Sequence, residues 1–543
     1  MVPAALLLIP FLLWPLGAML WRGVTPDGAL SVAAIADVVG DRFYWERLVF
    51  TTVQAAASTL LSVAVGLPAA YVLALIRFPG RGLVRSLITV PFVLPTIVVA
   101  LAFQQVVGPS GWVNDVLRTF GGSGINLNGT IWAILLAHVF YNLSIVVRLV
   151  SGVWANLDPG REEAARMLGA GRWATFRHVT LPALAPAIAA SAALTFTFTF
   201  TSFGVILLLG GGRASLDTLE VTIFRLATRL VQLPEAAVLS FVQLAATLAA
   251  LIAYSALQRR AATQVTLRAD TAKPLGRTSR AERVLIVAVA FGLGALILAP
   301  IAALVHGAFT VGGSGAPTLA NFRELFADTG RFSYIAPVDA VRWSLTFAAG
   351  ATLIAVVIGG SAGMAMARSR GRLLALVDGA LMLPLGIPAI VLGLGFLLTF
   401  NSGWYDLRGS PWLVLVAHAL IAYPFVLRTV LAVARSIDPH LPEVARLLGA
   451  SPWRVFRHIE MPILARALLV GAVFAFVISL GEFGATLLLR RREFATMPVA
   501  IFEALGRPGG LGQALAMATV LMTVTAGAVW GIERFRFREI GEF

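Results

Sequence analysis

The chain contains no cysteine, and lysine occurs only once among its 543 residues, at Lys273. The absence of cysteine excludes a disulfide framework and every cysteine-ligated metal site. The one lysine stands in the sequence TAKPLG, where a proline follows it. A phosphate-binding P-loop requires a lysine directly after its glycines, so the chain encodes no nucleotide-hydrolysing site of that kind. The six histidines form no HExxH pair, and we expect no metal site, cofactor or catalytic residue.

Charged residues are also scarce, at 13% of the chain, whereas 58% of the residues are hydrophobic and the mean hydropathy is +0.86. Such a composition is too apolar for a set of soluble domains and indicates an integral membrane protein. The net charge of +15 is almost entirely arginine. A basic balance can indicate nucleic-acid binding, but here the arginines lie in short loops between apolar runs. Membrane topology explains that placement better, and we expect no nucleic-acid partner.

Twelve apolar runs, each near the roughly 20 residues that cross a bilayer, predict six spans in each half of the chain. The first run could be mistaken for a signal peptide, but no positively charged segment precedes it, and Pro15-Leu16-Gly17-Ala18 resembles Pro300-Ile301-Ala302-Ala303 in the seventh run. We therefore expect a retained transmembrane helix. The predicted spans are 3–21, 51–76, 87–107, 131–152, 184–209, 236–257, 284–306, 344–367, 375–399, 412–434, 463–489 and 512–532.

One stretch of the sequence occurs twice. Residues 163–182 and 443–462 are identical at eleven of twenty positions with a constant offset of 280, so the chain contains two copies of one unit. In each copy a helix ends at a glycine, Gly169 or Gly449. A second short helix follows and is predicted to close at Pro182 or Pro462. The pattern predicts structured loops, 158–182 and 438–462, between membrane spans.

The repeat extends beyond these loops. Ala137-His138 matches Ala417-His418, and Phe203-Gly204 matches Phe483-Gly484, at the same offset. Upstream the offset widens to 293, with Pro95 matching Pro388, so the first half has a longer outer loop around 108–130. Because six is an even number, both halves enter the membrane in the same direction and form parallel repeats. We expect a first repeat over 1–257, a linker over 258–283 and a second repeat over 284–543.

The loops also predict the orientation. Arginines without acids lie between spans two and three and between spans eight and nine, and the 258–283 linker is strongly basic. By the positive-inside rule these segments and both copied loops are cytoplasmic, whereas loops 307–342 and 490–511 lie outside. Arg490, Arg491 and Arg492 are an exception to the rule, because they follow span eleven on the outer side.

The copied loop carries a resemblance to a known family. Glu163, Ala164, Ala165, Gly169, Leu181 and Pro182 match the signature of the permease subunits of binding-protein-dependent ABC importers. The second copy retains Glu443, Ala445, Gly449 and Pro462 but has Val444 for the middle alanine and Met461 for the leucine. In that family the loop is the coupling helix that docks into a groove of the cytoplasmic ATPase. The alternative is an amphipathic interfacial helix pair without a partner.

The resemblance implies an all-α integral membrane protein of twelve transmembrane helices in two parallel six-helix repeats, the type I ABC importer permease (MetI-like) fold. It implies a transport subunit rather than an enzyme, set in the bacterial inner membrane among its lipids. Two copies of a cytoplasmic ABC ATPase and an extracytoplasmic substrate-binding protein would be its partners. A secondary transporter or an integral membrane enzyme would be the rival class, but the former needs no docking loop and the latter needs a catalytic constellation.

The substrate is less well defined by the sequence. The segments RFPGR (77–81), AHVFYN (137–142), SFGVILLLGGG (202–212) and GEFGATLLL (481–489) look most like iron(III) and thiamine permeases. Polyamine, phosphonate and sulfate permeases remain alternatives, because importers of this type take their selectivity largely from the binding protein.

Polar residues inside the spans are candidates for the translocation pathway, because they are costly in lipid and face a cavity or the bundle interior. Gln104 and Gln105 lie near the outer end of span three and Asn142 lies in the middle of span four. Glu482 lies in span eleven, and Ser202, at the equivalent position of the first half, is also a candidate. Hydrogen bonding between helices is the alternative role for the amides, and pairing with a neighbouring helix is the alternative for Glu482.

The outer arginines have two possible roles as well. Arg490, Arg491 and Arg492 either bind lipid head groups or meet acidic residues of the docked binding protein. We expect the second role, in which rim charges chiefly affect association and its salt dependence.

Overall fold

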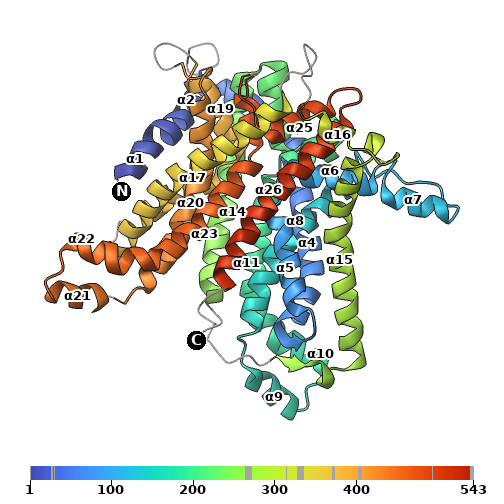
Figure 1. Ribbon diagram of the computed structural model, residues 1–543, viewed down its shortest axis with the longest axis vertical. Coiled ribbons are helices and arrows are strands. Elements are labelled where there is room, and N and C mark those ends of the chain that lie inside the picture. Colours follow the sequence, from blue (N-terminus) through green and yellow to red (C-terminus); the bar gives the residue numbers. More distant parts are fainter. Residues whose placement is uncertain are drawn as a thin grey trace.

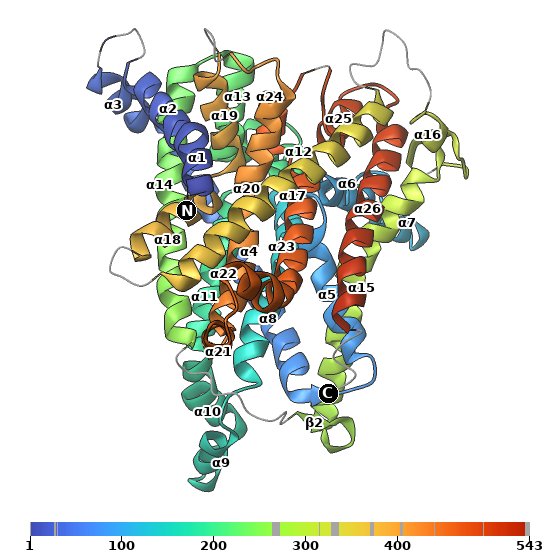
Figure 2. The same cartoon turned by 60° about the vertical axis from the view of Figure 1, so that its left-hand side comes forward.

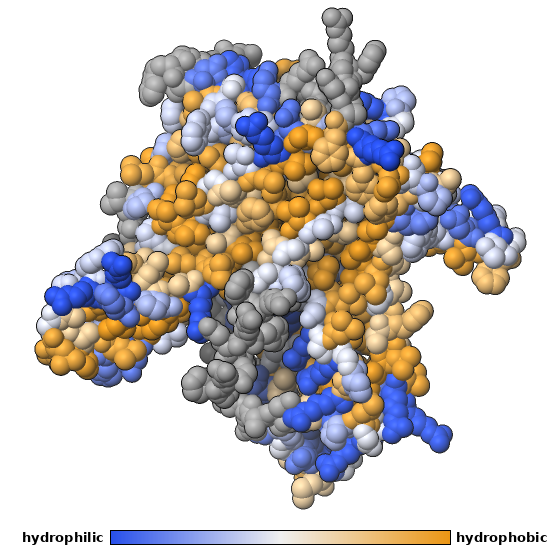
Figure 3. Space-filling model, viewed as in Figure 1, coloured by the Kyte–Doolittle hydropathy of each residue, from blue (hydrophilic) through white to orange (hydrophobic). Residues whose placement is uncertain are grey.

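The computed structural model describes residues 2–25, 29, 31–262, 272–313, 315–326, 336–369, 374–401, 406–438, 440–491 and 493–537. Within these residues eleven helices are long and apolar enough to cross a membrane. A bent pair, Leu376–Gly386 with Ala389–Thr399 at 93° to each other, makes a twelfth span if it is counted as one. Figure 3 shows a broad hydrophobic band around the middle of the molecule with hydrophilic residues toward both ends. These features confirm the predicted membrane class and the number of spans.

The first half runs from the N-terminus to the end of α14 (Figure 1). Its helices and strands are α1 (Val2–Leu8), the π-helical turn η1 (Ile9–Leu13), α2 (Trp14–Val24), α3 (Val32–Gly40), α4 (Arg42–Leu75), β1 (Ile76–Arg77), α5 (Arg81–Val93), α6 (Thr96–Val107), α7 (Trp112–Thr119), α8 (Ile131–Trp154), α9 (Pro159–Met167), α10 (Arg172–Thr175), η2 (Phe176–Thr180), α11 (Leu181–Phe200), α12 (Gly204–Leu209), η3 (Ala214–Leu216), α13 (Leu219–Arg225), η4 (Leu226–Leu230) and α14 (Leu233–Ala262).

The second half repeats the order of the long helices. Its elements are β2 (Lys273–Pro274), η5 (Leu275–Arg277), α15 (Arg280–Ala308), η6 (Val311–Gly313), α16 (Ala320–Arg323), α17 (Pro337–Arg368), α18 (Leu374–Met382), η8 (Leu383–Gly386), α19 (Ala389–Thr399), α20 (Pro411–Ser436), α21 (His440–Leu447), α22 (Pro452–Val455), η10 (Phe456–Glu460), α23 (Met461–Gly481), α24 (Gly484–Leu489), α25 (Met497–Leu505) and α26 (Leu511–Phe537).

The two halves pack in the same way at corresponding positions. Gly66 lets α4 approach α8 so closely that a Cβ there would lie 2.6 Å from Val146 Cγ1. Gly359 does the same for α17 and α20, where a Cβ would lie 2.9 Å from Cβ of Val426, the counterpart of Val146. Glycine permits such close helix contacts because it has no side chain. The repeat therefore includes the close packing of these interior helices.

In each half a side-chain hydroxyl caps the start of one short helix, α13 in the first half and the equivalent α25 in the second. The N–H of Leu219, at the start of α13, donates to Thr51 Oγ1 of α4 at 3.0 Å. The N–H of Met497, at the start of α25, donates to Ser344 Oγ of α17 at 2.7 Å. Each bond satisfies a helix-terminal donor that has no partner within its own helix, and each fixes a short helix beside the centre of the molecule.

Four of the predicted spans are interrupted and are not continuous helices. Spans 87–107 and 375–399 break before Pro95 and Pro388, since a proline drives the preceding residue out of the helical conformation. Spans 184–209 and 463–489 break at 201–203 and 482–483, and α12 and α24 begin beyond the breaks. At the second pair of breaks the chain turns toward the interface between the halves.

The prediction that the short loop helices close at Pro182 and Pro462 was wrong. Each proline lies in the first turn of a spanning helix, α11 or α23, which continues from the short helix through a π-helical turn. In η2 the N–H of Leu181 donates to Phe176 O, five residues back. A π-helical turn is wider than an α-helical one, and a wider turn accommodates the proline ring that would clash in a regular helix.

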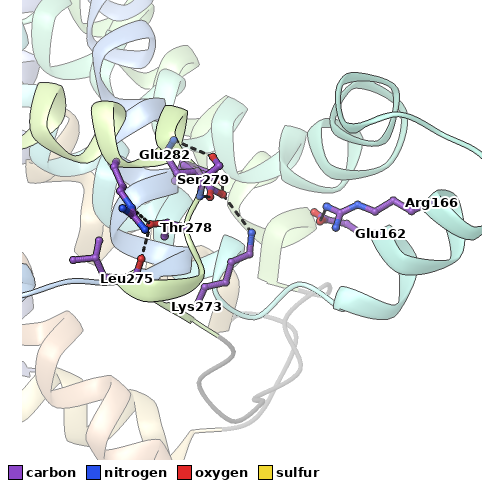
Figure 4. Close-up of polar contacts among 9 residues, drawn as sticks. Glu162, Arg166, Lys273, Leu275, Thr278, Ser279 and Glu282 are labelled. Atoms are coloured by element: carbon purple, nitrogen blue, oxygen red, sulfur yellow. Dashed lines mark hydrogen bonds and ion pairs between the residues drawn. The ribbon is translucent and has the colours of Figure 1, made fainter.

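A small junction connects the halves near the linker. Strand β1 pairs in parallel with β2, placing Ile76 opposite Lys273. Ser279 and Glu282 form a capping box at the start of α15, and Lys273 Nζ lies 3.3 Å from Glu282 Oε1 (Figure 4). Tyr71 of α4 donates to the same carboxylate at 2.9 Å. The first long helix of the second half is thus fastened to α4.

Candidate functional site

The two copied loops have the same backbone geometry. At the end of the first helix the N–H of Ala170 donates to Ala165 O at 3.0 Å, and the N–H of Gly169 donates to Arg166 O at 3.0 Å. The bonds of Ala450 to Ala445 and of Gly449 to Arg446 have the same lengths. This is the Schellman motif, which needs a residue with positive φ. Gly169 has φ +88° and Gly449 has φ +82°, as the sequence predicted.

Large apolar side chains stand in solvent at the tip of each loop. Met167 and Leu168 are each 89% exposed, and Leu447 and Leu448 at the same positions of the second loop are 86% and 83% exposed. Trp173 and its counterpart Trp453 are 71% and 64% exposed. Exposed apolar groups clustered in this way mark a surface for another protein or for a membrane. The first loop, with α9 and α10, projects from the bundle at the end where β2 lies, and the second, with α21 and α22, projects from its side (Figures 1 and 2).

The signature residues lie around these tips. Glu163, Ala164, Glu443 and Val444 are exposed, whereas Ala165 and Ala445 are half-buried. The loops are anchored differently. In the first, Thr180 donates to Glu162 at 2.7 Å, and Glu162 pairs with Arg166. In the second, Glu460 takes the place of Thr180 and pairs with Arg368 of α17.

A cavity of about 380 Å³ lies between the two halves. Breaks in four spanning segments supply much of its wall, since Thr201 to Gly204 and Gly481 to Gly484 line it together with Pro384 to Ala389 and Thr96. The rings of Phe203 and Phe483 stack across the interface with centroids 5.6 Å apart. A cavity of this size with a few polar groups is typical of a small-molecule site.

A buried histidine stands beside the cavity in each half. Nδ1 of His138 hydrogen-bonds with Ser58 Oγ at 2.8 Å, and its Nε2 hydrogen-bonds with Ser202 Oγ at 2.9 Å. His418 bonds Ser479 Oγ at 2.7 Å and Thr486 Oγ1 at 2.8 Å, and its Nε2 also lies 3.3 Å from Glu482 Oε2. Because both ring nitrogens are used in each case, the histidines hold the broken helices to their neighbours.

Three of the five pathway candidates lie together at this cavity. Asn142, Ser202 and Glu482 all line it. Gln104 and Gln105 do not, and Gln104 instead donates to Leu208 O at 3.3 Å, which is the helix-to-helix role given above as the alternative. Glu482 is also paired, since its carboxylate accepts from the N–H groups of Ala485 and Thr486 and from the Thr486 hydroxyl.

The sequence reasoning missed Glu220. This residue lies in the first turn of α13, is only 1% exposed and lines the cavity. Its Oε1 is buried without a hydrogen-bond partner in the described part of the chain. The segment between spans five and six was expected to be an outer loop. A glutamate in such a loop would be a solvated charge, so Glu220 was not considered a candidate. The matching sequences TLEVTIF (218–224) and TMPVAIF (496–502) could have shown that the segment is a buried part of the repeat.

The outer arginines have contacts within the chain. Arg490 Nε lies 3.2 Å from Glu503 of α25, and Arg491 is exposed and donates to Arg408 O at 3.0 Å. Burial raises the pKa of Glu503 above its ordinary value, while Arg490 and Arg507 partly offset the rise. Arg492 lies outside the described residues.

Comparison with known proteins gives a consistent picture. A family described as the binding-protein-dependent transport system inner membrane component matches residues 62–263 and 355–538, and each match includes one copied loop. The thiamine transport system permease protein ThiP of Brucella abortus (strain 2308) is 29% identical over 471 residues, which cover 86% of this chain and 83% of that protein. The protein of the same name from Escherichia coli (strain K12) is 28% identical, covering 86% and 84%.

Two further proteins are similar over shorter parts. The putative 2-aminoethylphosphonate transport system permease protein PhnV of Salmonella typhimurium is 32% identical over 37% of this chain and 75% of its own. Among solved structures, a bacterial ABC transporter involved in the import of the acidic polysaccharide alginate has a chain with a TM-score of 0.42 and 18% identity, covering 47% of this chain and 93% of that one.

Proposed function

Since the chain belongs to the family of binding-protein-dependent transport system inner membrane components, we propose that thiamine is the solute that its two halves carry into the cell. Similarity to permeases named for thiamine transport over 86% of the chain carries this proposal. The phosphonate-transport relative matches only 37% of the chain, so it supports the family more than the solute. Iron(III) is the second candidate, on the sequence resemblance alone.

The division of labour follows the two repeats. Residues 1–257 and 284–543 each supply one wall of the pore, and 258–283 connects them on the cytoplasmic side. The cavity between the walls, with Asn142, Ser202 and Glu482 on its surface, is part of the translocation pathway. A solute delivered from outside crosses this cavity when the halves change their relative position, as expected for alternating access between repeats.

Each copied loop docks one ATPase subunit, so that one chain carries two. The exposed apolar tips support this assignment, because Leu168 and Leu448 need a protein surface to cover them. Glu163 and Glu443, exposed beside these tips, are placed to meet polar groups of the ATPase. A rigid turn at Gly169 and Gly449 would transmit the movement of the ATPase into α11 and α23, since each loop continues into its spanning helix.

The orientation of the chain can be tested separately. We place both loops in the cytoplasm, and α7 and the arginines after α24 outside. Single cysteines can be introduced cleanly because the chain has none. A cysteine at Phe120 of the outer end, 85% exposed, should react with an impermeant maleimide in intact cells, and one at Leu168, 89% exposed, should react only after the membrane is opened. Labelling of the Leu168 position in intact cells would contradict the orientation.

The proposed function is tested by reconstitution. The chain is placed in vesicles with its ATPase and binding-protein partners, and uptake of radiolabelled thiamine is followed with and without ATP. We expect uptake that requires ATP, binding protein and an intact ATPase. A matched sample in which the ATPase carries an inactivated nucleotide site is the control. ATP-dependent uptake of iron(III) or spermidine but not of thiamine would overturn the substrate and leave the transporter class intact.

A further inference from the structure

The charges around the central cavity are all of one sign. Glu220 and Glu482 line it, and no lysine or arginine occurs among its described lining residues. The two carboxylates come from different halves and from positions that are not related by the repeat. In the second half, Pro498 occupies the position equivalent to Glu220. In the first half, Ser202 occupies the position equivalent to Glu482. The cavity therefore receives one glutamate from each half.

The two carboxylates differ in their hydrogen bonding. Glu482 accepts hydrogen bonds from two backbone N–H groups, at 2.8 and 3.0 Å, and from the Thr486 hydroxyl, and it lies beside His418. Its oxygens are used within the second half. Glu220 Oε1, by contrast, is buried and has no partner in the described part of the chain, and no ion pair of Glu220 occurs there. Glu220 is thus the carboxylate with bonding capacity to spare.

An unpartnered carboxylate at this depth is costly, because a buried charge needs a compensating charge or hydrogen bonds. Glu220 is fixed in place, because a hydrogen bond from the N–H of Leu219 to Thr51 holds the start of α13. Aromatic rings share the cavity wall, among them Tyr141, Phe198 and Phe425. Aromatic faces attract cations, and do so more strongly where water is excluded.

We propose that Glu220 is the recognition residue of a cation site in this cavity, and that the site takes small organic cations. The carboxylate supplies the opposite charge, and the aromatic wall supplies the apolar faces that an organic cation can contact. An anionic solute would meet two like charges and no compensating one. The described residues contain no group of three or more histidine or acidic side chains that could hold a metal ion, so the geometry favours an organic cation over a metal cation.

This inference rests on the proposed function, but it can be wrong while the proposed function is correct. If thiamine is delivered by a binding protein and the permease contributes no site of its own, ATP-driven uptake persists while the permease alone binds nothing. The experiment therefore measures binding to the chain in the absence of both partners, and uptake is measured separately as described above.

The purified full-length chain in lipid nanodiscs is titrated with radiolabelled thiamine as the probe. We expect saturable binding that unlabelled choline reduces and benzoate does not. Glu220→Gln keeps the shape and removes the charge, and losing one charge-assisted contact should weaken binding by about tenfold or more. Glu220→Asp should retain part of the affinity. Glu235→Gln, a glutamate of α14 outside the cavity lining, is the matched control and should bind as the unchanged protein does.

A second measurement needs no variant and so does not depend on folding. A hydrophobic carbodiimide modifies buried carboxyl groups, and mass spectrometry locates the adduct. We expect modification at Glu220 that decreases when thiamine is present, and little at Glu482, whose oxygens are already bonded. Absence of saturable thiamine binding, unchanged affinity in Glu220→Gln, equal competition by benzoate, or modification of Glu220 that thiamine does not reduce would each overturn the proposal.

Discussion

The two halves share a backbone plan and differ in charge where they meet. In the first half His138 joins two neutral hydroxyls, those of Ser58 and Ser202. In the second half the equivalent His418 also lies beside the carboxylate of Glu482. Positions that set the backbone, such as Gly169 and Gly449 or Gly66 and Gly359, are the same in both. The duplication therefore preserved the scaffold, while the polar groups on it diverged into a pathway with two unlike walls.

The outer rim shows the same contrast. Gly210, Gly211 and Gly212 follow α12, and Arg490, Arg491 and Arg492 follow α24 at the same repeat positions. The neighbouring ion pairs are reversed in sign: Arg225 of α13 pairs with Asp217 at 3.0 Å, and its counterpart Glu503 of α25 pairs with Arg490 at 3.2 Å. The two rims thus carry different charges at positions that the repeat relates. A binding protein with two lobes would meet a different surface on each half.

The largest effect is expected where the halves are alike. Gly169→Val and Gly449→Val each place a β-branched residue at positive φ, which costs about 1–2 kcal/mol or more and should distort the turn. No neighbouring atom lies within 4 Å of a Cβ at either site, so the strain is confined to the backbone. We expect each variant to reduce ATP-driven uptake by about tenfold or more while the protein still inserts.

Gly152→Val is the control for both turn variants, because this glycine is helical and exposed and also has no neighbour within 4 Å of a Cβ. It should retain uptake. If only one of the two turn variants lost uptake, the halves would not be equivalent in coupling.

The second comparison concerns the two walls of the cavity. Glu482→Gln cannot accept all the hydrogen bonds that the carboxylate receives, and loss of charge-assisted bonds at a buried site costs about 2–3 kcal/mol. Ser202→Ala removes one neutral bond to His138 and should cost about 1 kcal/mol. Thermal unfolding in detergent would rank the two variants, and uptake should decrease more for Glu482→Gln. An equal loss of stability in both would show that the Glu482 network adds nothing beyond the Ser202 bond.

The third comparison concerns helix packing. In Gly66→Ala the new Cβ meets side-chain atoms alone, Val146 Cγ1 at 2.6 Å and Val146 Cβ at 2.9 Å, whereas in Gly359→Ala it also meets backbone atoms, the carbonyl oxygen of Tyr423 at 2.7 Å and Leu427 N at 2.9 Å. Overpacking typically costs about 1–3 kcal/mol, and the backbone contact should place Gly359→Ala at the upper end. Thermal unfolding of both variants tests the order, and the reverse order would contradict the packing described for α17 and α20.

The smallest effect is expected at the rim. Arg491→Gln removes an exposed positive charge without breaking an ion pair of the described residues. If the arginines attract the binding protein, its affinity should decrease about two- to threefold at low salt and hardly at all at high salt, because exposed charges are screened. Arg42→Gln on α4, exposed at the same end, is the control. An unchanged affinity at low salt would favour contact with lipid head groups instead.

Much of the scaffold could be predicted from the sequence, because the apolar runs and the copied loop depend on local composition. The positive φ at Gly169 and Gly449 followed from one residue type at one helix end. The breaks at 201–203 and 482–483 could not be predicted, since the apolar run continues through them and only the contacts between the halves give the chain another direction. The partner of Glu482 could not be predicted for a related reason: His418 lies 64 residues away in sequence, and the fold alone brings the two side chains together.

The number of ATPase subunits bound by one chain tests the central claim most directly. Two copied loops with the same turn and the same exposed tips predict two equivalent docking sites. The mass of the detergent-purified complex of chain and ATPase, measured by native mass spectrometry, should correspond to one chain with two ATPase subunits. Replacing Leu168 or Leu448 with aspartate should leave complexes with one subunit. A single ATPase subunit on the unchanged chain, or two subunits that both variants retain, would contradict the account.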